Sequence, residues 1–376
     1  MKILFAGGGT GGHFYPIIAV ANSIRRMADE QNIIHVDMVL YSTKPYDKDI
    51  LKQHSIEFRN IPAGKVRRYF SILNFFDLFS TGIGIIKSLW GIFLDIPDVV
   101  FAKGGYASFP PLLAAKLFKI PTIIHESDVV PGKVNLWASK FADRIAISFP
   151  ETIKYFPKNK TALVGHPIRR TILSGTVEAA ISIFELEKDM PTILVIGGSQ
   201  GSQRINEIVL DIMPELVNKA QVIHQTGFKN LKDVRSRASV ALKNNPHQSR
   251  YHTVDFLNEN ELRNASTISK LVISRAGAGA IFNIAAWAKP SILIPIQDSA
   301  QDHQRQNAYS YARTGAAQVI EEANLSPHIL SAEIDKIFTN EHVAANMSKA
   351  AEAFSRIDAA DKTAKEILSL ALEHSS

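Results

Sequence analysis

The hydrophobic positions of this chain form short continuous runs that alternate with longer segments of helical periodicity. Short apolar runs are typical of parallel strands that are covered on both faces. In the first half the expected strands are residues 3–6, 36–41, 99–102, 122–125, 144–147 and 161–164. In the second half they are residues 191–196, 221–225, 270–274 and 291–295. This alternation predicts the α/β class with parallel sheets.

Each half of the chain opens with a strand, a glycine-rich turn and a helix. The turns are residues 7–12 and 197–201. A chain of 376 residues also exceeds what one core usually supports. We therefore expect two Rossmann-like domains that face each other across a cleft, residues 1–167 and 168–354. The last helix, within residues 355–376, is expected to pack back on the first domain.

The first glycine-rich turn leads directly into His13. Glycine lets the backbone turn sharply and lets a ligand approach closely, and Pro16 is expected in the first turn of the helix that follows. The positive end of the helix dipole disfavours a protonated imidazole, so His13 is expected to accept a proton. Residues 7–12 also match the dinucleotide fingerprint, but the second strand ends without the acidic residue that holds a ribose. An NAD-dependent oxidoreductase is therefore disfavoured, and a purely structural turn is the simpler alternative.

Composition and charge narrow the class of partner. The chain has 46% hydrophobic and 21% charged residues, which is typical of a globular protein. It has no cysteine, which excludes disulfides and thiolate metal sites and fits a reducing compartment. The net charge of +6 suits an anionic partner such as a nucleotide, a phosphate or an acidic membrane surface. No nucleic-acid-binding motif is present, and the first apolar run is too short for a signal peptide.

The segment from Arg67 to Leu94 is unusually apolar. Lys87 interrupts it, so it falls short of the roughly 18 uncharged residues that a membrane-spanning helix requires. One interpretation is two helices packed on the first sheet. The other is a surface patch that enters a bilayer. The residues expected to form that patch are Arg67, Arg68, Phe75, Phe76 and Phe79.

A series of motifs covers nearly the whole chain. They are Gly7-Gly-Gly-Thr-Gly-Gly-His13, Gly104-Gly-Tyr106, His125-Glu126, Gly165-His-Pro-Ile-Arg169, Gly197-Gly-Ser-Gln-Gly201, His224-Gln-Thr-Gly227, Arg275-Ala-Gly-Ala-Gly279 and Asp302-His-Gln304. In their order and spacing the chain resembles the MurG family. These GT-B glycosyltransferases add N-acetylglucosamine to undecaprenyl-pyrophosphoryl-muramoyl-pentapeptide (lipid I) in peptidoglycan synthesis.

The resemblance implies an inverting transfer from UDP-N-acetylglucosamine (UDP-GlcNAc) to lipid I. It also implies peripheral attachment to the cytoplasmic face of the plasma membrane, where other cell-wall synthesis enzymes are further candidate partners. The implied contacts with UDP-GlcNAc are Thr10, Gly11, Gly12, Asp128, Arg169, Ser199, Gln200, Leu257, Ala278, Gly279, Asn283 and Gln304. Gly105 and Tyr106 are implied on the acceptor side.

Among these residues, the resemblance makes His13 the leading candidate to deprotonate the acceptor hydroxyl. Glu126 is a second candidate base, or the group that orients the first. Ser199 would contact the UDP phosphates, the backbone of Leu257 would hold the uracil edge, and Gln304 would bind hydroxyls of the transferred sugar.

Several of these residues also have a structural interpretation. Ser199 suits the cap of the helix that follows it, and Glu126 suits a carboxylate bonded to loop amides. We interpret His125, His166 and His224 as structural. Two positions depart from the family pattern, because Asp128 stands where Asn is frequent and Asn283 where a ribose-binding Glu is common. Asn lacks the charge-assisted hydrogen bond of Glu.

The charge that develops on the UDP leaving group requires stabilisation. The Asp-x-Asp pair in the sequence, Asp47 and Asp49, is expected to be solvated surface rather than a metal site. A glycine-rich turn that opens a helix offers free amides to phosphate instead, and residues 197–201 and 276–280 have this character. The sequence therefore predicts that no metal is required, while stimulation by a divalent cation stays open.

Three other functions remain as alternatives. A GT-B transferase with another lipid acceptor, such as diacylglycerol, and a UDP-sugar epimerase would keep the fold. A non-catalytic, membrane-bound subunit would lack either the first or the second glycine-rich turn, and both are present.

Overall fold

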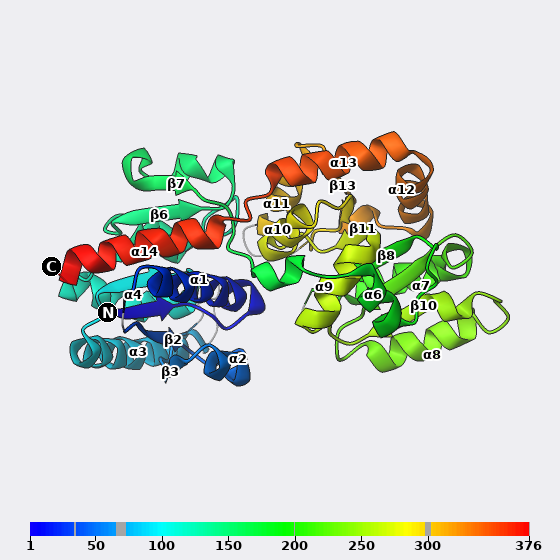
Figure 1. Ribbon diagram of the computed structural model, residues 1–376. Coiled ribbons are helices and arrows are strands. Elements are labelled where there is room, and N and C mark those ends of the chain that lie inside the picture. The colour runs from blue at the N-terminus through cyan, green and yellow to red at the C-terminus, as the bar shows by residue number, and fades with distance from the viewer. Residues whose placement is uncertain (34, 65–72, 199, 298–301, 376) are drawn as a thin grey trace. The chain divides into compact units, whose positions relative to one another are not determined.

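The computed structural model describes residues 1–33, 35–64, 73–198, 200–297 and 302–375 (Figure 1). The chain divides into two compact units. The N-terminal unit comprises Met1–Arg169 and Arg356–Ser376, and the C-terminal unit comprises Arg170–Ser355. Each unit is built around one parallel sheet.

The sheet of the N-terminal unit has seven strands in the order β3-β2-β1-β4-β5-β6-β7. The strands are β1 (Lys2–Ala6), β2 (Asp37–Ser42), β3 (Ile56–Asn60), β4 (Val99–Ala102), β5 (Thr122–Glu126), β6 (Arg144–Ile147) and β7 (Thr161–Leu163). The order reverses between β1 and β4, where Ala6 pairs with Ala102. In open parallel sheets, ligands bind beyond the carboxyl ends of the strands at this reversal.

Helices cover both faces of this sheet. They are α1 (Gly11–Glu30), α2 (Lys48–Gln53), α3 (Leu73–Asp95), α4 (Phe109–Phe118), α5 (Lys133–Ala138) and α14 (Ala359–Ser375), with short 3₁₀ helices at Tyr106–Ser108, Pro150–Tyr155 and Lys158–Lys160. The apolar sides of α1 and α14 pack together on one face, and α4 and α5 lie on the other. α14 lies beside α1 (Figure 1), where Asp361 accepts hydrogen bonds from Ser23 and Arg26, each at 2.7 Å.

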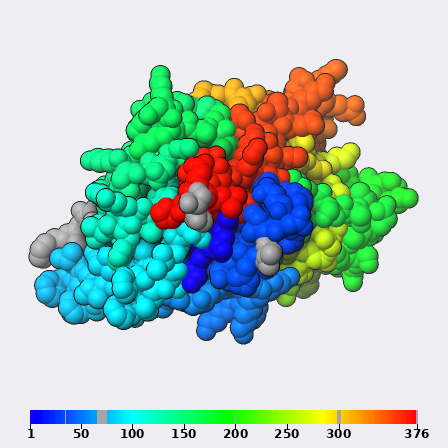
Figure 2. Space-filling model, turned by 60° about the vertical axis from the view of Figure 1, so that its left-hand side comes forward, coloured from blue at the N-terminus to red at the C-terminus, as the bar shows by residue number. Residues whose placement is uncertain are grey.

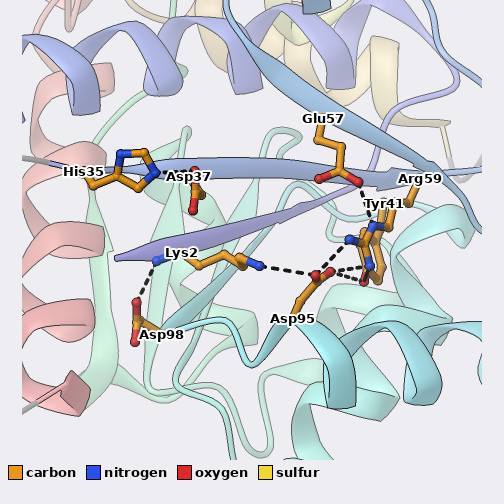
Figure 3. A network of polar contacts seen from close by, with 8 residues as sticks. All are labelled: Lys2, His35, Asp37, Tyr41, Glu57, Arg59, Asp95 and Asp98. Carbon is orange, nitrogen blue, oxygen red and sulfur yellow. Dashed lines mark hydrogen bonds and ion pairs between the residues drawn. The ribbon is translucent and has the colours of Figure 1, made fainter.

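A buried polar network joins the end of α3 to the first three strands (Figure 3). The carboxylate of Asp95 accepts hydrogen bonds from the Tyr41 hydroxyl at 2.8 Å and from Arg59 at 2.8 Å, and Nζ of Lys2 lies at 3.3 Å. Burial, followed by the bond to Asp95, raises the pKa of Tyr41 and keeps the phenol a donor. These contacts anchor one end of α3 to the sheet.

The sheet of the C-terminal unit has six strands in the order β10-β9-β8-β11-β12-β13. They are β8 (Thr192–Ile196), β9 (Gln221–Gln225), β10 (Tyr251–Val254), β11 (Ser269–Ser274), β12 (Ser291–Leu293) and β13 (Ala317–Val319). The helices are α6 (Val177–Phe184), α7 (Gln203–Leu216), α8 (Leu231–Ala241), α9 (Glu259–Ile268), α10 (Ala278–Ala286), α11 (His303–Ala312), α12 (Pro327–Thr339) and α13 (Glu341–Phe354), with 3₁₀ helices at Arg170–Leu173, Gln248–Arg250 and Glu322–Asn324. Here the order reverses between β8 and β11, next to the second glycine-rich turn.

Three details differ from the expectations. The edge strands β3, β10 and β13 were not predicted, because they are short and mix polar with apolar residues. Residues 73–95 form the single helix α3, where two helices were one interpretation of residues 67–94. Pro16 lies in the second turn of α1 rather than the first, because α1 begins at Gly11.

Candidate active-site residues in each unit

The first glycine-rich turn lies at the strand reversal of the N-terminal unit. Gly7, Gly8 and Gly9 have φ angles of 137°, 110° and 85°, which L-residues with a Cβ rarely adopt. A Cβ on Gly8 would also lie only 2.8 Å from Oγ of Ser42. The turn therefore needs glycine to pack against β2, and Thr10 follows as the N-cap of α1.

His13 lies in the first turn of α1. Its Nδ1 is 3.2 Å from Oγ1 of Thr10. With Nδ1–H donating to that hydroxyl, Nε2 keeps the lone pair that accepts a proton. Burial, followed by the positive charge of Lys103, lowers the pKa of His13 to about 4, while Asp128 opposes the shift. The imidazole is therefore neutral at neutral pH.

Glu126 ends β5 and is buried. Its Oε1 accepts from the amides of Ser127 at 2.8 Å and Asp128 at 3.1 Å, and its Oε2 accepts from the amide of Gly132 at 3.0 Å and from Nδ2 of Asn135 at 2.8 Å. Burial, followed by the charge of Asp128, raises the pKa of Glu126. This carboxylate holds the loop after β5 in place.

The acceptor-side candidates adjoin the same turn. Gly105 has a φ of 77°, and a Cβ there would lie 3.4 Å from Cε1 of His13, so the ring packs directly on this glycine. The hydroxyl of Tyr106 faces Gly9, where a Cβ would lie 3.8 Å away. Gly105 and Tyr106 thus lie beside His13 and the glycine-rich turn.

Arg169 ends the first segment of the N-terminal unit. Its guanidinium lies 4.0 Å from the ring centroid of Tyr15, a cation–π contact. Tyr15 also adjoins Gly11, where a Cβ would lie 3.4 Å from its ring. Arg169 is therefore held next to the start of α1, near Thr10, Gly11 and Gly12.

The second glycine-rich turn lies at the strand reversal of the C-terminal unit and precedes α7. Gly201 has a φ of 75°, and a Cβ there would lie 2.0 Å from the carbonyl oxygen of Thr226. Ser202, rather than Ser199, is the N-cap of α7 and accepts from the amide of Ile205. Ser199 itself lies outside the described residues, as do Arg67 and Arg68 of the expected membrane patch.

Two side chains that belong to the motifs, but for which no role was expected, fix this turn. Gln225 donates from Nε2 to the carbonyl of Gly198 at 2.9 Å, and its Oε1 accepts from the amide of Leu257 at 3.1 Å. Arg275 donates to Ser202 and Glu322, each at 2.6 Å. Gln225 thereby connects the glycine-rich turn to Leu257. The amide of Leu257 already donates its hydrogen bond to this side chain. Gln200 lies in the same turn.

The other expected donor contacts lie on two helices of the same unit. Ala278, Gly279 and Asn283 belong to α10, whose N-cap is Gly277. Gln304 lies in the first turn of α11, and its Oε1 accepts from the amide of Ile296 at 3.2 Å. The ends of β8, β11 and β12 thus each carry expected nucleotide-sugar contacts or their supports.

The remaining candidates have structural partners. Asp47 caps α2, because its Oδ1 accepts from the amides of Asp49 at 2.9 Å and Ile50 at 3.0 Å. His224 is buried, with Nδ1 2.7 Å from the Tyr251 hydroxyl and Nε2 3.0 Å from Oδ1 of Asn206. His125 and His166 are also buried, and their rings lie edge to face at 6.0 Å.

The chain is similar to known proteins along nearly its whole length. Residues 3–147 match the glycosyltransferase family 28 N-terminal domain, and residues 192–363 match the family 28 C-terminal domain. A relative from Clostridium botulinum is 35% identical over 93% of this chain and 94% of its own length, and one from Natranaerobius thermophilus is 35% identical over 98% of this chain and 100% of its own. Both are named UDP-N-acetylglucosamine--N-acetylmuramyl-(pentapeptide) pyrophosphoryl-undecaprenol N-acetylglucosamine transferase.

Among solved structures, Acinetobacter baumannii MurG is similar with a TM-score of 0.74 at 22% identity, covering 98% of this chain and 99% of that one. At this identity the likeness shows the fold. Together with the two parallel sheets and the two matched domains, it confirms the expected GT-B class.

Proposed function

This chain belongs to glycosyltransferase family 28, and we infer from that membership that it transfers N-acetylglucosamine from UDP-GlcNAc to undecaprenyl-pyrophosphoryl-N-acetylmuramoyl-pentapeptide. The product is lipid II, a precursor of peptidoglycan. The observation that carries this inference is the 35% identity to transferases of that name over 93% and 98% of the chain.

We propose that the C-terminal unit binds the UDP moiety of the donor. The N-terminus of α7, which follows the second glycine-rich turn, and the N-terminus of α10 offer backbone amides and positive dipole ends to a diphosphate. Hydrogen bonds from Gln225 to the carbonyl of Gly198 and from Arg275 to Ser202 fix the shape of this region. The developing charge on UDP would then be stabilised by the backbone, so the proposal requires no metal and leaves room for stimulation by a divalent cation.

We propose His13 as the base. The acceptor hydroxyl gives its proton to Nε2 of His13 while its oxygen forms a bond to the anomeric carbon. The bond from that carbon to the β-phosphate oxygen breaks, and UDP leaves with the electron pair. Attack from the face opposite UDP inverts the anomeric centre. The carboxylate of Asp128, which raises the pKa of His13, would stabilise the imidazolium that forms.

The geometry favours His13 over Glu126 for this role. The Glu126 carboxylate already accepts from loop amides and from Asn135 on both of its oxygens. A base that gave up these bonds would leave several buried donors without partners, which is costly. The proposal therefore assigns Glu126 to holding the loop that carries Asp128.

We also propose that α3 and the end of α4 attach the N-terminal unit to the membrane. The side chains on this surface are apolar yet exposed. They are Phe75, Phe76, Leu78, Phe79, Ile86, Trp90, Phe93, Leu94, Ile96, Leu117 and Phe118. The rings of Phe93 and Phe118 lie 6.4 Å apart, which connects the two helices into one patch. The cyan atoms of these helices form a continuous part of the surface in Figure 2.

The number of exposed apolar side chains on α3 and α4 supports a role for this surface in binding a membrane. Monomeric proteins rarely leave a contiguous apolar patch of this extent open to water. Among the described residues, Phe75–Asp95 is also long and apolar enough to span a membrane, and only 22% of its most apolar stretch is buried inside the protein. Asp95 is bonded to Tyr41 and Arg59 of the sheet, so α3 would lie on the bilayer rather than cross it. Lys87 is exposed on α3 and offers a charge to anionic headgroups.

A panel of acceptors tests the proposed substrate. UDP release is measured with a lipid I analogue, with diacylglycerol and without acceptor. The proposal predicts release that depends on the lipid I analogue. Release with diacylglycerol alone would indicate another lipid glycosyltransferase, and conversion of the nucleotide sugar without any acceptor would indicate an epimerase.

A further inference from the structure

Lys103 is an almost fully buried lysine directly after β4, with 1% of its surface exposed. Lysine is rarely buried to this extent unless it has partners. Its Nζ lies 2.7 Å from Nδ1 of His125 and also donates to the hydroxyl of Ser127. Neither the sequence motifs nor the proposed mechanism gives this side chain a role.

The hydrogen-bond partners of His125 determine which of its two ring nitrogens carries the hydrogen. Nε2 of His125 lies 2.9 Å from the carbonyl oxygen of Gly165, which can only accept, so Nε2 carries the hydrogen. Nδ1 is then the acceptor for the ammonium of Lys103. One charged group thus ties together the ends of β4 and β5 and the segment after β7.

Lys103 also packs against the first glycine-rich turn, which leads into α1 and His13. A Cβ on Gly7 would be 3.1 Å from Cβ of Lys103, so the first glycine-rich turn rests on this residue. Two residues further on, Gly105 packs against the ring of His13. The backbone from Lys103 to Gly105 therefore adjoins both the turn and the base.

The charges around Lys103 come from three neighbouring elements. The titratable groups are His13 on α1, His125, Glu126 and Asp128 at the end of β5, and His166 after β7. Burial lowers the pKa of Lys103 to about 7, against the carboxylates of Glu126 and Asp128, which raise it. Lys103 is therefore protonated in the acidic range where His13 titrates, and its charge opposes protonation of that ring.

We propose that Lys103 is a positioning residue whose buried ammonium clamps the loop after β5 through Ser127 and His125 and, next to the first glycine-rich turn, opposes protonation of His13 in the acidic range. Asp128 has the opposite effect on the same ring, so the two side chains balance the basicity of His13. Only the catalytic consequence rests on the proposed function. The effect on the imidazole is a property of the free chain.

The test is an NMR titration of the His13 imidazole in the full chain from pH 8 down to 3. The His13 signal is assigned by its loss in His13→Gln. In the native chain we expect no titration above pH 5. Lys103→Met should raise the pKa of His13 by about one unit, and Asp128→Asn should lower it. Lys140→Met removes an exposed lysine of the same unit and should change nothing.

Two further variants keep the test decisive. Lys103→Arg retains the charge and should leave the pKa of His13 low. If Lys103→Met does not fold, Lys103→Gln keeps a hydrogen-bond donor for Ser127, removes the charge and carries the same expected rise. An unchanged His13 pKa in a folded, uncharged variant overturns the proposal.

Kinetics separate this proposal from the proposed function. The acidic limb of the kcat/KM profile should move upward by about one pH unit in Lys103→Met. A purely structural role would instead lower kcat at every pH without moving the limb. If the NMR shift occurs while His13→Gln keeps full transferase activity, the electrostatic assignment holds and the assignment of the base fails.

Discussion

The hydroxyl oxygen of Thr10 lies 3.2 Å from Nδ1 of His13, three residues further along the chain. Thr10 is the N-cap of α1, and His13 lies in the first turn of that helix. The cap residue can therefore orient the imidazole as well as begin the helix. When Nδ1 donates to Thr10, Nε2 is the nitrogen that the proposed mechanism assigns to the acceptor hydroxyl.

The role of His13 leads to the first prediction. His13→Ala should lower kcat by about 10²–10⁴-fold, because general base catalysis contributes that much. The UDP dissociation constant, measured by calorimetry, should stay the same. Thr10→Val should lower kcat by about fivefold, since it removes one hydrogen bond worth about 1 kcal/mol that orients the ring. Near-native turnover of His13→Ala would exclude His13 as the base.

Glu126 should matter for stability more than for chemistry. Glu126→Ala removes the acceptor of several buried donors, so it should lower the free energy of unfolding by about 3 kcal/mol. Urea unfolding measures this loss. Glu366→Ala breaks a surface ion pair with Arg144 in the same unit and should cost less than about 1 kcal/mol. Native stability combined with lost turnover in Glu126→Ala would instead make Glu126 the chemical group.

The membrane patch predicts vesicle binding that depends on phenylalanine. Replacing Phe75, Phe76 and Phe79 with serine should reduce flotation with anionic vesicles at least about tenfold. Each ring that inserts into the bilayer contributes roughly 1.5 kcal/mol or more to binding. These rings are 72%, 62% and 67% exposed, so the variant should remain folded. Binding should also weaken at high salt.

The control for this experiment lies on the C-terminal unit. Phe228→Ser with Val240→Ser removes two side chains that are 81% and 74% exposed and should leave flotation unchanged. Loss of near-UV circular dichroism in the phenylalanine variant would show that its rings support the core. Unchanged flotation of that variant would contradict the patch.

His224 predicts acid sensitivity of the C-terminal unit. Burial lowers the pKa of His224 from its ordinary value of 6.5 to about 3. The unfolded chain therefore takes up a proton as the pH falls below 6.5, while the folded chain does not. The resulting loss of stability begins near pH 6.5, continues toward pH 3 and reaches about 2 kcal/mol at pH 5.

The measurement is urea unfolding at several pH values. His224→Gln should be less stable at neutral pH but should lose less stability between pH 7 and pH 5 than the native chain. His342→Gln replaces an exposed histidine of the same unit and should keep the native slope. A His224→Gln slope equal to the native slope would contradict this assignment.

The sequence predicted the central strands because their runs are apolar on both faces. β1, β4 and β9 lie where the runs placed them. β13, with the sequence Ala-Gln-Val, is too short and too polar to stand out. α3 is helical as expected, but hydrophobicity alone cannot tell a buried face from an exposed one. Only the structure shows that Trp90 and Phe93 belong to the exposed patch.

The candidate site was predictable where glycine marks it and not where ordinary side chains support it. The positive φ angles of Gly7 and Gly201 account for the two turns. Lys103 was not predicted because lysine is normally exposed. Gln225 belongs to a motif, but its role was not predicted because a lone glutamine carries no chemical signature. Their partners come from strands adjacent in space but distant in sequence, so only the fold brings them together.

The most direct test of the account is transfer of labelled sugar. The native chain is incubated with UDP-GlcNAc carrying a radiolabelled sugar and with a lipid I analogue. We expect UDP and a labelled disaccharide lipid in equal amounts, with the anomeric configuration inverted relative to the donor. Consumption of UDP-GlcNAc to free sugar or to another nucleotide sugar, without label in the lipid, would contradict the account.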